Sequence, residues 1–182
     1  KGVQDLCVRS LREGGDLELL HASPNWKTSG SWMPDGRSVL FDEQDPETNR
    51  DLKVLSLGDK PEARALLATP FDEITPEVSP DGRWMAYMSN ETGRGEVNVR
   101  PVSGSFEQWQ VSTTGGSQPR WRGDGRELYF VSPDGFLMAV AIGAAVCSGV
   151  VAGLIAVLAM PGMWAVGRRM ATFRYPQRRV GK

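Results

Sequence analysis

The stretch E-V-S-P-D-G-R-W-M-A-Y-M-S-N, at residues 77–90, decides the fold of this chain. Proline fixes φ for the second position of a tight turn, aspartate hydrogen-bonds to nearby backbone, and glycine adopts the left-handed conformation that follows. The three turn residues are Pro80, Asp81 and Gly82. They predict that Ser79–Arg83 joins two antiparallel strands, Thr75–Val78 and Arg83–Ser89. Residues 84–88 are nearly all apolar, which predicts a strand buried on both faces between stacked sheets.

The same turn motif occurs three times along the chain. It reads M-P-D-G-R at residues 33–37, S-P-D-G-R at 79–83 and R-G-D-G-R at 122–126, with the aspartates 46 and then 43 residues apart. Each phrase precedes a short β-rich run, so the repeating unit is made of strands. A spacing in the forties is typical of a repeat architecture. The other turn residues are Pro34, Asp35, Gly36, Asp124 and Gly125, and a further S-P-D-G turn contains Pro133, Asp134 and Gly135.

Each unit has room for two more strands after its hairpin. Glu96–Arg100 alternates apolar and polar residues, which predicts a third strand with one buried face and one wet face. Trp109–Ser112 predicts a short fourth strand. Four antiparallel strands in about 40 residues is the size of one blade of a β-propeller.

The sequence therefore predicts an all-β chain, a partial β-propeller of four-stranded antiparallel blades with an apolar tail. The predicted division is the end of a preceding blade at 1–28, full blades at 29–72 and 73–115, an incomplete blade at 116–142 and the tail at 143–182. Two to three blades fall short of the four to eight that close a propeller. We therefore expect the intact protein to be longer or to assemble.

The tail has two interpretations. Residues 136–167 contain no charged side chain, and residues 143–167 are long enough for a helical membrane span. Six basic residues follow, which by the positive-inside rule would place the C-terminus in the cytoplasm. The alternative is that the tail is an out-of-frame read of a GC-rich gene, which would also be rich in Ala, Gly, Val and Arg and free of acids.

Charge is distributed unevenly along the chain. Residues 1–134 hold all 22 acids and 15 of the 21 bases, a net charge of −7, whereas residues 135–182 hold six bases and no acid. A mildly acidic propeller part argues against a nucleic-acid-binding surface.

Three sequence elements carry a family resemblance. They are the W-x-P-D-G or V-S-P-D-G turn, the R-x-x-A-Y-x-S-N strand at residues 83–90 and the E-V-x-V-R-P strand at residues 96–101. With them, residues 5–140 resemble the TolB-like, WD-like propeller repeat of bacterial proteins. Residues 79–140 resemble most the extracytoplasmic C-terminal propeller of bacterial eukaryotic-like serine/threonine protein kinases.

The resemblance implies a non-catalytic binding or sensing module, periplasmic or otherwise extracytoplasmic. Its ligand would be a protein or peptide bound at the propeller loops or channel, and residues 143–167 would contact the membrane if they span it. The alternative is a piece of an enzyme, either the kinase itself or a propeller-capped serine peptidase, or a piece of a Tol-type periplasmic protein. The chain contains no kinase motif, so a kinase domain would lie upstream of Lys1.

No residue in the sequence forms a convincing catalytic, cofactor or metal site. His21 is the only histidine and is interpreted as a loop residue at a blade edge, and no G-x-S-x-G elbow occurs. Cys7 and Cys147 lie in regions of different character, which argues against a disulfide or a metal site.

Three further features have structural interpretations. The acidic stretch 42–51 lacks the spacing of a calcium loop and is expected to be a solvated hairpin loop. Asn90-Glu91-Thr92 has the form of a glycosylation sequon but is expected to be the loop after a strand. Four tryptophans recur at matched points and are expected to pack between blades rather than to line a ligand channel; they are Trp32, Trp84, Trp109 and Trp121.

Overall fold

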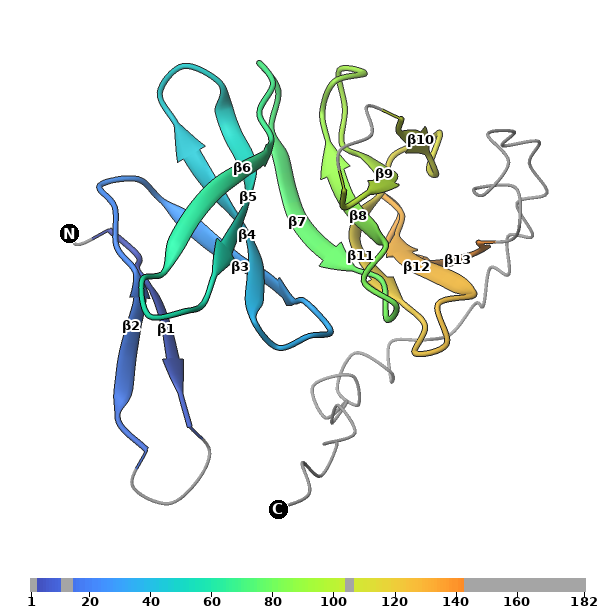
Figure 1. Cartoon of the computed structure of the whole chain (residues 1–182). Coiled ribbons are helices and arrows are strands. Elements are labelled where there is room, and N and C mark those ends of the chain that lie inside the picture. Colours follow the sequence, from blue (N-terminus) through green and yellow to red (C-terminus); the bar gives the residue numbers. More distant parts are fainter. Residues whose placement is uncertain (1–2, 11–14, 104–106, 143–182) are drawn as a thin grey trace.

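The computed structural model describes residues 3–10, 15–103 and 107–142, and this part of the chain is all β. Its strands form four antiparallel sheets in sequence order (Figure 1). The first sheet is β1 (Leu6–Arg9) and β2 (Leu17–His21). The second is β3 (Lys27–Trp32), β4 (Ser38–Asp45), β5 (Asn49–Ser56) and β6 (Glu62–Leu67). The third is β7 (Glu73–Val78), β8 (Trp84–Ser89), β9 (Glu96–Pro101) and β10 (Trp109–Gln110). The fourth is β11 (Ser117–Trp121), β12 (Glu127–Val131) and β13 (Leu137–Ala141).

The sheets stack face to face, each offset from the one before. Strand β7 packs across β3, β4 and β5, and β11 repeats this arrangement on β7, β8 and β9. One apolar cluster fills the space between the second and third sheets, and it consists of Leu40, Leu52, Val54, Val78, Met85 and Tyr87. Another fills the space between the third and fourth sheets, with Ala86, Val97, Val99, Leu128 and Phe130. This packing of successive four-stranded sheets confirms the predicted β-propeller architecture.

The predicted burial of β8 on both faces is confirmed, and the strand predicted at Glu96–Arg100 is present as β9, but its predicted wet face is wrong. Met85, Ala86 and Tyr87 are each at most 1% exposed, so β8 is buried on both faces. In β9, Glu96 and Asn98 are buried as well as the valines between them, so no face of this segment is wet. Period-two alternation indicated a half-exposed strand, but the valines face the fourth sheet and the polar Glu96 is buried by hydrogen bonds to Ser112 and Gly115 in the segment that follows β10.

The first strand of the second, third and fourth sheets contains a β-bulge at an equivalent position; these strands are β3, β7 and β11. The pairing register shifts between Ser29 and Trp32 in β3, with matching shifts in β7 and β11. Thr75 and Gln118 occupy equivalent bulge positions and have φ of 53° and 52°. A bulge bends its strand and increases the local twist, and β7 and β11 share the same bulge conformation.

The acidic stretch 42–51 is not the solvated loop that the sequence predicted. Asp42, Glu43 and Asp51 lie in β4 and β5 and are at most 3% exposed. Asp42 pairs with Arg50 and accepts the backbone N–H of Thr75 at 3.1 Å, which links the second sheet to the third. Partners on neighbouring strands make burial of these charges tolerable, and only residues 46–48 form the turn.

Glu43 belongs to a buried charge cluster that attaches the first sheet to the second. Lys27 Nζ, with a fully buried side chain, donates to the carbonyls of Gln4, Asn25 and Ser23 at 2.9, 2.8 and 3.2 Å. It also lies 3.9 Å from Glu43 Oε1, and the second oxygen of Glu43 accepts from Lys53 Nζ at 2.7 Å. Lys27 therefore connects the segment before β1 to the loop between β2 and β3.

His21 ends strand β2, which corrects its prediction as a loop residue. Its Nε2 is 3.7 Å from Glu43 Oε1, and its ring lies 5.4 Å from that of Phe41. The histidine therefore packs at the junction of the first two sheets.

The predictions for residues 143–182, including the membrane span and Cys147, lie outside the described residues. Within residues 3–10, 15–103 and 107–142, no helix has the length and apolarity that crossing a bilayer requires.

Candidate interaction surface

Three Pro-Asp-Gly-type turns lie along one edge of the stacked sheets, and Figure 1 shows them on the lower side of the arc. Each turn closes with a backbone hydrogen bond from its glycine N–H to the carbonyl three residues earlier, at 2.8–2.9 Å. Gly36, Gly82 and Gly125 have φ of 68°, 75° and 72°. These are left-handed conformations that a β-carbon disfavours. The fourth predicted turn, with Pro133, Asp134 and Gly135, joins β12 to β13 instead, and Gly135 has φ 81°.

The turn aspartates hold the backbone of their own turns. Asp35 Oδ1 accepts the N–H of Arg37 at 2.8 Å, and the same bond recurs in the other two turns at 3.1 and 3.0 Å. Asp81 also accepts from the Ser79 hydroxyl at 2.6 Å. Each turn aspartate therefore uses its carboxylate to stabilise the backbone of its own turn.

The turns of neighbouring sheets touch. A β-carbon placed on Gly82 would lie 3.4 Å from Pro34 Cδ, and one on Gly125 would lie 3.7 Å from Pro80 Cδ. The glycine of each later turn therefore lies close to the proline of the preceding turn.

We call this edge the turn rim and define it as residues 33–37, 79–83 and 122–126. It presents exposed arginines at a fixed position after each turn glycine and one more in the third turn: Arg37, Arg83, Arg126 and Arg122. Arg83 pairs with Asp81 at 2.6 Å, and Arg122 pairs with Asp124 at 3.4 Å and Glu127 at 3.2 Å. Such exposed pairs are weak and exchange readily with other partners. The side chains of Arg37 and Arg126 form no ion pair within the described residues.

Two carboxylates near the rim have pKa values that are shifted in opposite directions, down for Asp81 and up for Glu77. Partial burial acts to raise the pKa of Asp81, but hydrogen bonds from Ser79 and Arg83 outweigh it and lower the pKa. Burial raises the pKa of Glu77, and only the Arg120 guanidinium opposes this rise. Arg120 Nη1 lies 3.4 Å from Glu77 Oε2, so this pair connects β11 to β7.

The four tryptophans differ in their roles. Trp121 is half-buried, and its indole N–H donates to the carbonyl of Glu77 at 3.0 Å across the gap between the third and fourth sheets. Trp84 and Trp109 meet edge to face, with ring centroids 5.5 Å apart. Trp32 is 47% exposed, which contradicts its expected packing between blades.

The other residues considered in the sequence analysis, Cys7 and the sequon Asn90, have structural positions of their own. Cys7 is exposed on β1 and unpaired. The side chain of Asn90 donates to Asp72 Oδ2 at 3.0 Å and accepts the N–H of Asp72 at 2.9 Å, so the sequon asparagine fastens the end of β8 to the start of β7. Among the described residues, no group of three or more His, Cys, Asp or Glu side chains is arranged to hold a metal ion.

The arginine rim was not predicted from the sequence, although a signal for it was present. Arginine follows the glycine in all three turn phrases. Its side chain plays no part in turn geometry, so its recurrence could have indicated a shared exposed edge.

Solved structures with a similar fold are β-propeller proteins. A putative TolB from Agrobacterium tumefaciens aligns with a TM-score of 0.60 at 17% identity, over 76% of this chain and 57% of that one. TolB from Acinetobacter baumannii aligns with a TM-score of 0.63 at 17% identity, over 72% of this chain and 34% of that one. Prolyl oligopeptidase B from Galerina marginata aligns with a TM-score of 0.58 at 11% identity, over 74% of this chain and 20% of that one.

No protein-family model matches the sequence, and no curated protein does. The chain spans between about a fifth and about three-fifths of the length of these structures. The alignments agree with the stacked four-stranded sheets and the repeated turns in indicating a β-propeller. The chain is a β-propeller fragment with a TolB-like fold.

Proposed function

We propose that this chain is a non-catalytic binding or sensing module that recognises a protein or peptide at its turn rim. The observation that supports the proposal best is the row of exposed arginines held on turns of fixed geometry. Guanidinium groups bind carboxylates through paired N–H donors. The rim therefore suits a partner that carries Asp, Glu or a C-terminal carboxylate.

Rigidity of the scaffold supports recognition at this edge. Each turn is closed by its own aspartate and touches its neighbour, so the arginine backbones are fixed before a partner arrives. A rigid scaffold that presents loop residues is a common arrangement for binding sites. Pre-positioned groups reduce the entropy cost of association.

For the parent protein, the proposed context is the extracytoplasmic part of a bacterial signalling protein such as a serine/threonine protein kinase. The sequence elements at 83–90 and 96–101 support it, together with the fold shared with TolB. The alternative is a fragment of a propeller-capped serine peptidase or a Tol-type periplasmic protein. The structural similarity to a prolyl oligopeptidase supports this alternative.

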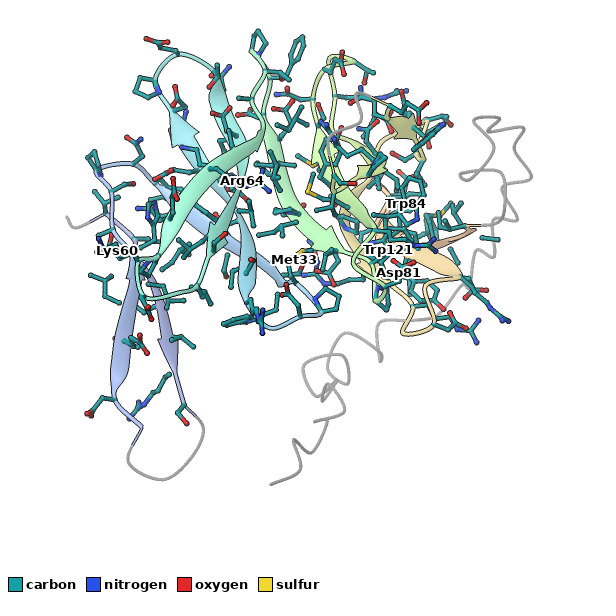
Figure 2. The ribbon with its side chains drawn as sticks, viewed as in Figure 1. Met33, Lys60, Arg64, Asp81, Trp84 and Trp121 are labelled. Atoms are coloured by element: carbon teal, nitrogen blue, oxygen red, sulfur yellow. The ribbon has the colours of Figure 1, made fainter. Side chains whose placement is uncertain are left out.

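Binding at the rim can be tested with a displayed random-peptide library selected on the full chain. We expect the selected peptides to be acidic and the double variant Arg37→Ala/Arg126→Ala to weaken their binding at least tenfold. Arg64→Ala is the matched control, because Arg64 is exposed on β6 and lies away from Asp81 of the rim in Figure 2. Equal binding by the parent chain and the double variant would refute recognition at the rim.

The context is tested by sequencing the encoding DNA on both sides of the segment for Lys1–Lys182. A glycine-rich loop, an H-R-D loop and a D-F-G motif upstream would support the kinase. A G-x-S-x-G motif downstream would support the peptidase instead. A frame break near Val140 would show that the tail is not part of the natural protein.

A further inference from the structure

The junction between the first and second sheets is repeated between the second and third sheets, and we call these the first and second junctions. Lys27 pairs with Glu43 across β3 and β4, and Glu73 pairs with Ser89 in the same way across β7 and β8. Strands β1–β2 and β5–β6 also share a register shift at the same place. Equivalent residues lie 46 positions apart in the sequence. The two junctions can therefore be compared residue by residue.

The loops that lead into β3 and β7 share their hydrogen bonds as well. The N–H of Asn25 donates to Ser23 Oγ at 3.3 Å, and the N–H of Phe71 donates to Thr69 Oγ1 at 3.2 Å. A backbone bond to the last residue of each loop also recurs, and it runs from Gln44 to Trp26 and from Asn90 to Asp72. The carbonyls of the two loops are therefore placed in the same way.

A buried cation fills the first junction. Lys27 Nζ lies 3.7 Å from Asp5 Oδ1 and 3.9 Å from Glu43 Oε1. It also donates to three backbone carbonyls, in the segment before β1 and in the loop before β3. Carboxylate and carbonyl oxygens therefore surround one positive charge.

The second junction has an acid where the first has its lysine. Glu73 takes the position of Lys27, and Asp51 takes that of Asp5. Glu73 is 2% exposed and Asp51 is 3% exposed. Glu73 Oε2 and Asp51 Oδ1 have no hydrogen-bond partner within the described residues. Burial raises the pKa of Glu73, and the charge of Asp51 raises it further.

The acid at the equivalent position of the next junction is satisfied by the protein. Glu96 corresponds to Asp51, and it accepts from the Ser112 hydroxyl and from the N–H of Gly115 at 3.0 Å. Asp51 accepts from the Thr48 hydroxyl at 2.9 Å through its other oxygen. Unpartnered oxygens on buried carboxylates are costly, and a bound ion is one way in which proteins satisfy them.

The basic side chains of β5 bind other acids. Lys53 Nζ lies 2.7 Å from Glu43 Oε2, and Arg50 pairs with Asp42. The two free carboxylate oxygens of the second junction therefore face each other's charge without a hydrogen bond from these cations.

We propose that Asp51 and Glu73 bind a calcium ion at the second junction, in the place that the ammonium group of Lys27 holds at the first. Two carboxylates match the charge of a divalent cation. The backbone carbonyls equivalent to those that bind Lys27 belong to Arg50, Thr69 and Phe71. All these donors are oxygens, which hard cations prefer. Calcium accepts carboxylates and carbonyls in irregular geometry, whereas magnesium retains water that a buried site excludes.

Isothermal titration of calcium into the full chain, after treatment with a chelator, tests the site. We expect one site, and a rise in melting temperature of about 5 °C or more when free calcium exceeds its Kd about a hundredfold. Asp51→Asn and Glu73→Gln should each weaken binding about tenfold or more, because each removes a charged ligand. Asp5→Asn is the matched control and should leave binding unchanged, because Lys27 already fills the first junction.

Glu73→Lys supplies a second readout. Its ammonium group should take the place of calcium, as Lys27 does at the first junction. The variant should therefore melt above the chelator-treated parent and should no longer respond to calcium. Glu73→Gln separates loss of binding from loss of folding, because without calcium it relieves the repulsion from Asp51 and should be more stable than the parent at neutral pH.

Three results would overturn the proposal. The first is the absence of calcium binding to the parent chain at about 10 mM, where even weak extracellular calcium modules are saturated. The second is binding that Asp51→Asn and Glu73→Gln leave unchanged, which would place the ion elsewhere. The third is a melting temperature that rises with sodium but not with calcium, which would assign the junction to a monovalent cation.

Discussion

The turn of the third sheet rests on the turn of the second at one contact, between Gly82 and Pro34. A β-carbon on Gly82 would lie 3.4 Å from Pro34 Cδ, and the glycine backbone has φ 75°. Gly125 repeats the relationship with Pro80, at 3.7 Å. The glycine therefore serves both the conformation of its own hairpin and the packing of two sheets.

Replacing Gly82 with valine should lower the free energy of unfolding by more than about 1 kcal/mol, because a β-branched side chain is disfavoured at positive φ. Urea denaturation measures the change. Gly58→Val is the control, since a β-carbon there meets nothing within 4 Å and its φ is not positive. Equal stability of the two variants would contradict the assigned turn.

Trp121→Phe should cost about 1 kcal/mol of stability, because it removes the indole donor and leaves the carbonyl of Glu77 without it. Thermal unfolding can detect the loss. Trp26→Phe provides a comparison at an exposed tryptophan, where a change within about 0.5 kcal/mol is expected. A loss as large at Trp26 as at Trp121 would show that the bond between sheets is unimportant.

Lys27→Met should lower stability by about 3 kcal/mol, because it leaves three backbone carbonyls without their buried donor and removes a buried cation 3.9 Å from Glu43. Its effect should concentrate on the first sheet, since the carbonyls of Gln4 and Ser23 flank β1 and β2. Hydrogen exchange at Leu6–Arg9 should therefore accelerate. Lys53→Met should cost less, because Lys27 still faces Glu43 in that variant.

Glu73→Gln should stabilise the chain at neutral pH. Burial raises the pKa of Glu73 above its usual value of 4.5, and Oε2 has no hydrogen-bond partner. The folded state therefore holds its proton more tightly than the unfolded state, so this carboxyl favours folding at low pH and the benefit is lost as pH rises above 4.5. The variant should exceed the parent in unfolding free energy at pH 8. The two should converge near pH 4, and parallel stability curves across this range would contradict the raised pKa.

Features of the fold could be predicted from the sequence where they are caused by residues close to one another in the chain. The Pro-Asp-Gly turns, their spacing and the apolar run of β8 are local patterns, and each had its expected conformation. Strand β9 was misjudged because its polar residues, Glu96 and Asn98, are buried rather than exposed to water. Glu96 is satisfied there by the hydroxyl of Ser112 and the N–H of Gly115. Alternation alone cannot distinguish such a strand from one that faces water.

The buried acids show the same limit in another form. Asp42 and Glu43 appeared to belong to a solvated loop, because the pairing of Asp42 with Arg50 needs the β4–β5 hairpin and the partners Thr75 and Lys27 lie outside residues 42–51. The candidate site was likewise only partly predictable. Each arginine of the rim follows a turn that the sequence identified, but the row exists only because the sheets stack in register.

The sequence by itself determined the all-β architecture, the four-stranded repeat and the positions of its turns, since these depend on φ preferences and on apolar periodicity within a few residues. Only the tertiary structure decided that Lys27 and Glu43 are buried together, that Trp121 binds Glu77 and that Trp32 remains exposed. The physical reason is that burial and hydrogen bonding at these positions depend on other strands and loops that are distant in the sequence, as Glu77 is from Trp121 and Gln4 is from Lys27.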